Sequence, residues 1–455
     1  MKQEETPETT RPKINSEELN ELIKSPPDYL LRDNGRTIYF EGYDVEGEID
    51  LDDELEIKEN LIFDKCSFLS DEPFSIIGMI CHGEVTFKFC NFSSDIYLIN
   101  GTFNREFSFR YIESKKIFIW GGKYEKIRIS GYTINKIEIC GGRFQDIDIG
   151  GFPINGNIEK LTIRDRGYKL GNINVSRQNF TKINIGGLNS GNTYNFKGVK
   201  SNIVSISNFT NEGYLHFYSM EPRDSTNDTR YFQISNSNLG KTEFFRTQFS
   251  KYQEFIIIDS FITDSLFINC NWGKNIRAFH ASDGALPSGS SVTNKEVPKI
   301  REAYRQLKIS MSKHSDKIQE DKFYAEELNY YNKSLAWVWP WYNQFWDKLI
   351  LYFSNWFSSY GQSFIKPLFW LLLGHFLFFS IPLLYGVFEP LGFSLINSSG
   401  EAFWLATEKY FEYINPFRSF DNSLSGGYFI IDILMRVWSS YMIYNIIRAS
   451  RRFII

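Results

Sequence analysis

A twenty-residue repeat near the centre of the chain constrains the fold more than any other feature. Residues 119–129 read IWGGKYEKIRI and residues 139–149 read ICGGRFQDIDI, so apolar, glycine and charged positions recur in the same order. A period of about twenty residues is typical of solenoids, in which each coil buries its apolar face only against its neighbours. The repeat therefore predicts a stack of similar coils.

Short runs of alternating apolar and polar residues flank this repeat from residue 36 to residue 275. Each run predicts a strand of three to five residues with one face inward. Strands without intervening helices favour a parallel β-helix over a leucine-rich repeat, and the general handedness of parallel crossovers predicts a right-handed coil. A β-sandwich is the alternative, but it would not explain the twenty-residue register. We expect the solenoid domain to span residues 35–278.

The first 34 residues are polar, with a short helix predicted from Ser16 to about Ile23 and a cap at Ser16. The segment lacks the apolar stretch of a secretory signal, so we expect the solenoid to lie in the cytosol. The five cysteines form no CxxC pair and are interpreted as small buried hydrophobic residues rather than metal ligands. They are Cys66, Cys81, Cys90, Cys140 and Cys270.

Residues 279–298 are rich in turn-forming residues and are interpreted as a linker. Apolar residues spaced three or four apart then predict a helical hairpin over residues 299–334. The run His314-Ser315-Asp316 is expected to separate its two helices.

Residues 335–455 are interpreted as a membrane module, and eight of the ten tryptophans lie in it. Tryptophan favours the headgroup level of a bilayer, so residues 342–358 predict an interfacial helix, with a buried soluble helix as the alternative. The predicted interfacial anchors are Trp337, Trp339, Trp341, Trp346 and Trp356.

Two segments of this module are predicted to span a bilayer. Residues 367–388 contain no acidic residue, lysine or arginine, and residues 427–447 are apolar except for Asp432, Arg436 and a few uncharged polar residues. Asp432 and Arg436 lie one helical turn apart, and with His375 they form a predicted polar stripe at membrane depth. Such groups usually face a helix bundle or a wet cavity. A pore or coupling element and a structural ion pair both remain open.

Arginines follow the second segment and predict its orientation. Arg448, Arg451 and Arg452 belong on the cytosolic side by the positive-inside rule. Two spans then place both termini in the cytosol and the protein in the inner, cytoplasmic membrane. Residues 402–414, between the spans, are amphipathic and end before Pro416.

At this point the chain resembles a family, bacterial pentapeptide-repeat-like β-helix membrane proteins with a C-terminal two-span, ion-channel-like module. The resemblance covers about residues 300–455, and loosely the solenoid. It rests on the motifs YRQLK (304–308), FYAEE (323–327), SYG (359–361) and KP (366–367). It implies a right-handed β-helix and a helical hairpin in front of a module similar to the potassium-channel pore.

Two departures from that pattern limit what the resemblance implies. The coils here lack a strict five-residue repeat, and residues 415–420 read NPFRSF rather than a TVGYG-type filter. Selective potassium conduction is therefore not predicted, while a non-selective pore and a membrane anchor both stay open. By architectural analogy alone, such an arrangement suits bacterial stress response or phage defence.

The sequence shows no nucleophile–base pair, phosphate-binding loop or metal cluster, so we expect no cofactor and no metal. The net charge of −4 argues against a nucleic-acid partner. We predict a non-enzymatic membrane effector that binds the lipid bilayer, forms a homo-oligomer and binds a protein partner on its solenoid. The alternatives are a passive anchor or scaffold, and a β-helix carbohydrate-active enzyme that would use Asp146, Asp148, Asp165 and Arg164.

Overall fold

A computed structural model describes most of the chain, namely residues 11–51, 55–150, 157–165, 170–224, 229–273, 276–278, 292–340, 342–385, 400–420 and 426–451. The chain divides into two compact units, residues 1–306 and 307–455. Each unit is described by itself. Most of the predicted linker lies outside the described residues.

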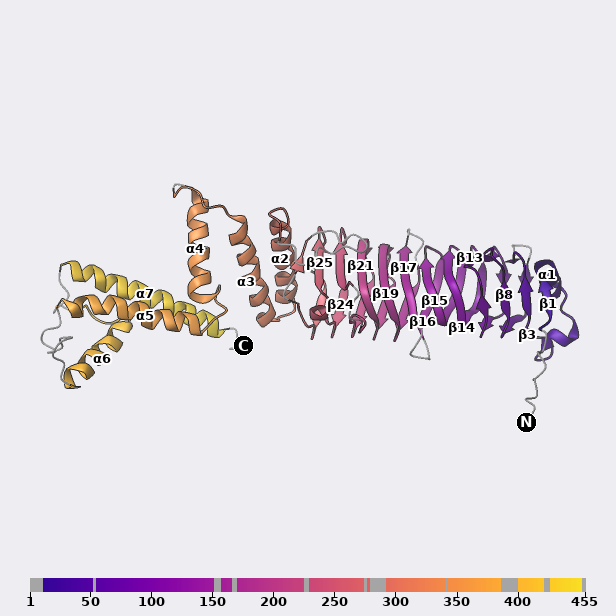
Figure 1. Cartoon of the computed structure of the whole chain (residues 1–455), viewed down its shortest axis with the longest axis horizontal. Helices are drawn as coiled ribbons and strands as arrows, with labels where there is room; N and C mark the ends of the chain where they lie inside the picture. Colours follow the sequence, from indigo (N-terminus) through magenta and orange to yellow (C-terminus); the bar gives the residue numbers. More distant parts are fainter. Residues whose placement is uncertain are drawn as a thin grey trace, which may run out of the picture. The chain divides into compact units, whose positions relative to one another are not determined.

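The first unit is a parallel β-solenoid, as predicted, and Figure 1 shows its strands stacked side by side in successive coils. The first half contains β1 (Lys13–Asn15), β2 (Leu31–Arg32), β3 (Thr37–Glu41), β4 (Asp44–Glu46), β5 (Asp50–Leu51), β6 (Glu56–Ile57), β7 (Asn60–Asp64), β8 (Ser67–Leu69), β9 (Phe74–Ile77), β10 (Ile80–Cys81), β11 (Val85–Lys88), β12 (Asn91–Phe92), β13 (Ile96–Ile99) and β14 (Thr102–Trp120). The second half contains β15 (Lys123–Ile139), β16 (Arg143–Gly150), β17 (Asn157–Asp165), β18 (Asn172–Ser176), β19 (Asn179–Asn189), β20 (Thr193–Lys197), β21 (Lys200–Asn211), β22 (Tyr214–Tyr218), β23 (Tyr231–Ser235), β24 (Thr242–Phe245), β25 (Glu254–Ile258), β26 (Leu266–Ile268) and β27 (Ile276–Arg277). The right hand of the coil stays a prediction.

The register of the central coils confirms the twenty-residue repeat. Ile127 on β15 pairs with Ile147 on β16, twenty residues later. Coils elsewhere are longer, since Val204 on β21 pairs with Phe232 on β23. The predicted strand length was wrong for β14, which has 19 residues. This strand continues round the coil through local register shifts instead of stopping at each corner.

Stacked aromatic rings fill the interior of the coils. Phe63 lies between Phe40 and Phe87, with ring centroids 5.0 and 4.9 Å away. A second column runs near the other end, in the order Phe196, Phe217, Phe244 and Phe267. Each fully buried ring contributes about 1.5–3 kcal/mol by removal from water, and the stacked geometry adds about 0.5–1.5 kcal/mol a pair. Identical residues at the same register thus build one continuous core.

The cysteines are free, and four of the five are buried, as expected. Two of them, Cys66 and Cys90, precede the paired residues Ser67 and Asn91 and so occupy the same position on successive coils. The Cys66 Sγ donates to the Phe40 carbonyl oxygen at 3.5 Å, and the Cys90 Sγ donates to the Phe63 carbonyl oxygen at 3.4 Å. These residues therefore act as small core residues at this position.

The N-terminal end of the solenoid is closed by α1 (Ser16–Lys24), whose Leu19 and Ile23 are buried. The predicted cap at Ser16 was wrong, because Ser16 is the first helical residue. Asn15 is the cap: its side chain accepts from the Glu18 amide at 2.9 Å, and the Glu18 carboxylate accepts from the Asn15 amide at 3.0 Å. Because β1 pairs with β4, the first coil begins before the predicted boundary at residue 35.

The last coil is closed by α2 (Val297–Lys313), which begins two residues before the predicted hairpin start. The Ile262 amide donates to Gln306 Oε1 at 2.9 Å, and Lys299 Nζ lies 3.0 Å from Asp259 Oδ2. Both ends of the sheet are therefore covered, which protects its edges from pairing with other chains.

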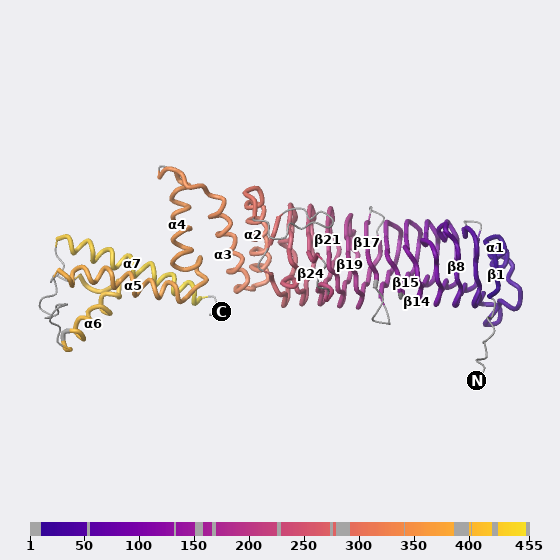
Figure 2. The backbone as a smooth tube through the Cα atoms, in the orientation of Figure 1, coloured from indigo at the N-terminus to yellow at the C-terminus, as the bar shows by residue number. Residues whose placement is uncertain are grey.

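The second unit is helical, with α3 (Lys317–Ser334), α4 (Asn343–Ser358), α5 (Ile365–Leu384), α6 (Gly400–Ile414) and α7 (Gly427–Arg451). The predicted break in the hairpin is confirmed: Ser315 has φ +60°, and Asp316 caps α3 by accepting from the Gln319 amide at 3.1 Å. In Figure 2, α5 and α7 run alongside each other, with α6 at an angle to them. α7 extends four residues beyond the predicted end at residue 447.

Candidate functional site

Two helices of the described residues, α5 and α7, are long and apolar enough to span a membrane. At about 1.5 Å per residue, the 20 residues of α5 match a hydrocarbon core of about 30 Å. Only 33% of the apolar window of α5 and 28% of that of α7 are buried within the protein. Both helices therefore present large apolar faces that the described part of the chain leaves uncovered.

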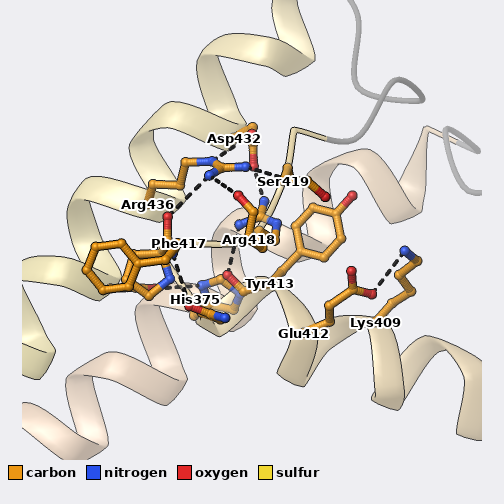
Figure 3. Close-up of polar contacts among 12 residues, drawn as sticks. His375, Lys409, Glu412, Tyr413, Phe417, Arg418, Ser419, Asp432 and Arg436 are labelled. Atoms are coloured by element: carbon orange, nitrogen blue, oxygen red, sulfur yellow. Dashed lines mark hydrogen bonds and ion pairs between the residues drawn. The ribbon is translucent and has the colours of Figure 1, made fainter.

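The polar centre of this unit is Asp432 on α7, which is 1% exposed (Figure 3). Its Oδ2 lies 3.0 Å from Arg436 Nε, one helical turn along α7. Its Oδ1 accepts from Arg418 NH2, from the segment that follows α6. One carboxylate thus pairs with two guanidinium groups, and these three residues are called the arginine clamp below.

Arg436 also binds the backbone of the segment between α6 and α7. Its NH1 donates to the Arg418 carbonyl oxygen at 2.6 Å and to the Pro416 carbonyl oxygen at 3.2 Å, and its NH2 donates to the Ser419 carbonyl oxygen at 2.9 Å. Guanidinium groups suit such recognition because their five donors have a fixed planar geometry. The clamp therefore fastens this segment to α7.

Arg418 is the member that the sequence analysis missed. It lies 14 positions from Asp432 and outside any apolar segment, so spacing gave no reason to pair them. Its guanidinium carbon lies 3.7 Å from the centroid of the Tyr413 ring, and its NH1 donates to the Tyr413 carbonyl oxygen at 3.1 Å. The aromatic face and the end of α6 together hold Arg418 in place.

His375, on α5, is fully buried but is not joined to the clamp. Among the described residues it hydrogen-bonds to neither Asp432 nor Arg436. Its Nδ1 lies 3.5 Å from the Ser439 hydroxyl, and its ring packs edge-on against Tyr410. Its Nε2 has no hydrogen-bond partner within the part of the chain that the structure describes. Among the described residues, no hydrogen bond therefore joins His375 to the other two residues of the predicted polar stripe.

Helices α5 and α7 pack closely near the arginine clamp and His375. A Cβ at Gly374 would lie 2.4 Å from Trp438 Cε2, so only glycine fits there. The Trp438 indole donates to the Trp370 carbonyl oxygen at 3.1 Å, and the Tyr410 hydroxyl donates to the Leu372 carbonyl oxygen at 2.8 Å. α5, α6 and α7 therefore pack as one three-helix unit.

Four of the five predicted interfacial tryptophans lie at the surface. Trp337, Trp339, Trp346 and Trp356 are between 47% and 74% exposed, and Trp341 lies outside the described residues. Lys348 Nζ on α4 lies 5.3 Å from the Trp337 ring centroid. The side chains are free to reach a bilayer interface, and their role as anchors stays a prediction.

The arginines at the end of α7 border a pocket of about 390 Å³. Arg448 and Arg451 line it together with Lys308, Lys317 and Tyr324. The Arg448 guanidinium carbon lies 5.8 Å from the Tyr324 ring centroid. Arg452 lies outside the described residues. Glu320 and Asp321 also line the pocket, and the cytosolic position of these arginines stays a prediction.

The carboxylates considered for an enzyme are held within the solenoid. Asp146 Oδ1 accepts from the Asn172 amide group at 3.2 Å, and Asp148 Oδ1 accepts from the Asn174 amide group at 3.1 Å. Asp165 is 2% exposed and accepts from the Leu170 amide. The described residues contain no group of three or more histidine, cysteine or acidic side chains that could hold a metal ion.

Comparison of the chain with protein-family models, with curated proteins and with solved structures finds no match.

Proposed function

We propose that the chain is a non-enzymatic integral membrane protein. Its solenoid binds a ligand or partner in the cytosol, and its helical unit lies in the inner membrane as a self-associating effector module. The observation that carries the proposal is the uncovered apolar surface of α5 and α7. We propose no nucleic-acid partner for the chain.

The physical argument starts from the cost of exposing that surface to water. Large apolar side chains on α5 and α7 remain well exposed, among them Phe369, Phe376, Leu377, Leu384, Ile430, Leu434 and Val437. Each Å² of apolar surface transferred out of water contributes about 25 cal/mol. Soluble monomers rarely leave contiguous patches of this kind uncovered, whereas lipid covers them without cost.

The basic end of α7 supports a cytosolic position for both flanks of the helical unit. Arg448 and Arg451 lie there, and two spans return the chain to the side from which it entered. Self-association is supported by the resemblance to two-span channel-like modules, since two helices cannot enclose a path across a bilayer alone. The analogy with stress-response or phage-defence effectors stays a prediction.

Membrane extraction tests the proposal. Full-length protein should stay in the membrane pellet after alkaline carbonate washing. Changing Phe376 and Leu377, both exposed on α5, to Asp should move protein into the supernatant, since charges inside a bilayer cost several kcal/mol. Leu69→Asp, at an exposed apolar position of the solenoid, is the matched control and should not. Release of the unaltered protein by carbonate would contradict the proposal.

A passive anchor is the second candidate, and the arginine clamp favours it. In potassium-channel filters the backbone carbonyls point at the ion. Here the carbonyls of Pro416, Arg418 and Ser419, at the corresponding place after α6, accept hydrogen bonds from Arg436. Liposomes that stay electrically silent at every protein density would select the anchor, and protein-dependent ion flux would select the effector.

A further inference from the structure

Lysines stack at one register position on four successive coils of the solenoid. Lys116 on β14 pairs with Lys136 on β15, which pairs with Lys160 on β17, which pairs with Lys182 on β19. Neighbouring strands lie about 4.8 Å apart, and like charges directly opposite each other destabilise a sheet. A column of this kind therefore needs negative charge beside it.

The first half of the column has that negative charge within the protein. Glu138 Oε2 lies 2.8 Å from Lys136 Nζ and 3.4 Å from Lys116 Nζ. On the next two coils the register position of Glu138 is taken by Thr162 and Asn184. The acid is thus replaced by neutral side chains where the column reaches Lys160.

A pocket of about 500 Å³ opens at this second half of the column. Lys160, Arg164 and Lys182 line it, with Asn184 and Asn208 beside them. Gly187 forms part of its wall with φ +92°, and a Cβ there would lie 1.8 Å from the Asp165 carbonyl oxygen. The glycine therefore allows β19 to lie close to the backbone of β17 at this wall.

Two basic side chains and one hydroxyl group at the pocket have no polar partner among the described residues. Neither Lys160 nor Arg164 has an ion pair among the described residues, and the buried Thr162 hydroxyl between them has no hydrogen-bond partner. Asp165 is the acid among the lining residues, and it belongs to the inward, buried side of β17 with Leu161 and Ile163. The outer wall is accordingly basic.

We propose that this pocket binds a small soluble ligand carrying at least two phosphate groups. Lys160 and Arg164 lie four residues apart on one strand, which places their backbones roughly 13 Å apart. An extended ligand can reach both ends, whereas a single phosphate cannot. Phosphate oxygens suit arginine and lysine donors, and the volume falls within the range of about 300–1,000 Å³ for small-molecule sites. The inference rests on the proposed binding role of the solenoid and not on its membrane role.

Calorimetry on the full chain in detergent tests the inference, with tripolyphosphate, ATP and inorganic phosphate as probes. Tripolyphosphate should bind, and inorganic phosphate should bind roughly tenfold or more weakly, because it loses at least one charged contact. If ATP binds with the same affinity as tripolyphosphate, the site recognises the phosphates alone. If ATP binds more tightly, the ligand is of the nucleotide type. Both results support the site.

The variant Lys160→Gln/Lys182→Gln should weaken tripolyphosphate binding by roughly 100-fold or more, because it removes two charged contacts and each is expected to contribute about tenfold or more in affinity. Lys116→Gln is the matched control, since it makes the same change in the same column outside the pocket, and its affinity should stay within about twofold. Thermal unfolding of each variant checks that the solenoid is folded.

Three results would overturn the inference: no binding of tripolyphosphate at millimolar concentration, equal affinity for a dicarboxylate such as glutarate, or an equal loss in Lys116→Gln. Carbonate extraction is unaffected by all of them, so failure of this site and failure of the membrane proposal are distinguishable.

Discussion

Arg436 and Asp432 form an ion pair one turn apart on α7, with Arg436 Nε 3.0 Å from Asp432 Oδ2. The pair is completed by Arg418, which is 9% exposed and contacts the other carboxylate oxygen. A buried carboxylate shared by two arginines holds the segment after α6 against α7. The clamp thus connects the packing of α7 to the geometry of the segment that follows α6.

Removing the carboxylate should destabilise the helical unit strongly. Asp432→Ala leaves the buried guanidinium group of Arg418 and the partly buried one of Arg436 without their shared carboxylate. Breaking a buried ion pair in this way typically costs about 3–5 kcal/mol. Thermal unfolding in detergent measures the effect. Glu412→Ala, which removes a half-exposed pair with Lys409, is the control and should change stability by less than about 1 kcal/mol.

Replacing only the two α7 residues should be worse than replacing the whole clamp. Asp432→Leu/Arg436→Leu leaves Arg418 buried without its carboxylate, whereas adding Arg418→Leu removes that charge as well. We expect the triple variant to unfold at a higher temperature than the double variant. The reverse order would mean that Arg418 is stabilised chiefly by Tyr413.

Gly374 should not tolerate a larger residue. Gly374→Val would force the side chain into the Trp438 indole, and overpacking of this kind typically costs about 1–3 kcal/mol. Lower thermal stability, or loss of protease resistance of α5 and α7, would report it. Gly400→Val is the control, because a Cβ there has nothing within 4 Å; equal losses in both variants would count against close α5–α7 packing.

The stabilisation that ionised Glu138 gives the solenoid should be lost in acid. Burial alone would raise the pKa of Glu138, but Lys136 and Lys116 outweigh it and hold that pKa below its ordinary 4.5. Because the folded-state pKa is lowered, the stabilisation is present above about pH 4.5 and is lost as the pH falls through the folded value. Glu138→Gln should therefore lower the unfolding temperature at pH 7 and reduce its drop below pH 4.5. An unchanged acid slope in Glu138→Gln would contradict the assignment.

The membrane topology of the two predicted spans can be measured with reporters. A cysteine placed at Ser398, between the two helices and outside the described residues, should be labelled from the periplasmic side of intact cells. A reporter fused after residue 455 should give a cytosolic signal. Labelling of position 398 only after cell lysis would contradict two spans.

The sequence was sufficient for the solenoid, the hairpin break and the two apolar helices. A solenoid coil contacts mainly its neighbours, so a repeat such as that of Ile127 and Ile147 translates directly into register. The sequence failed at the cap of α1 and at the length of β14, because cap geometry and corner bends depend on backbone angles that neighbouring coils impose.

The polar centre of the helical unit was decided by tertiary structure. Helical periodicity alone brings Asp432 and Arg436 together, since residues four apart share a face. It cannot report that Arg418 completes the clamp, that His375 lies against Ser439, or that Lys160 and Arg164 border a pocket. These relationships depend on residues that lie on different helices or on neighbouring coils. The distances between those residues are fixed only when the helices and coils pack together.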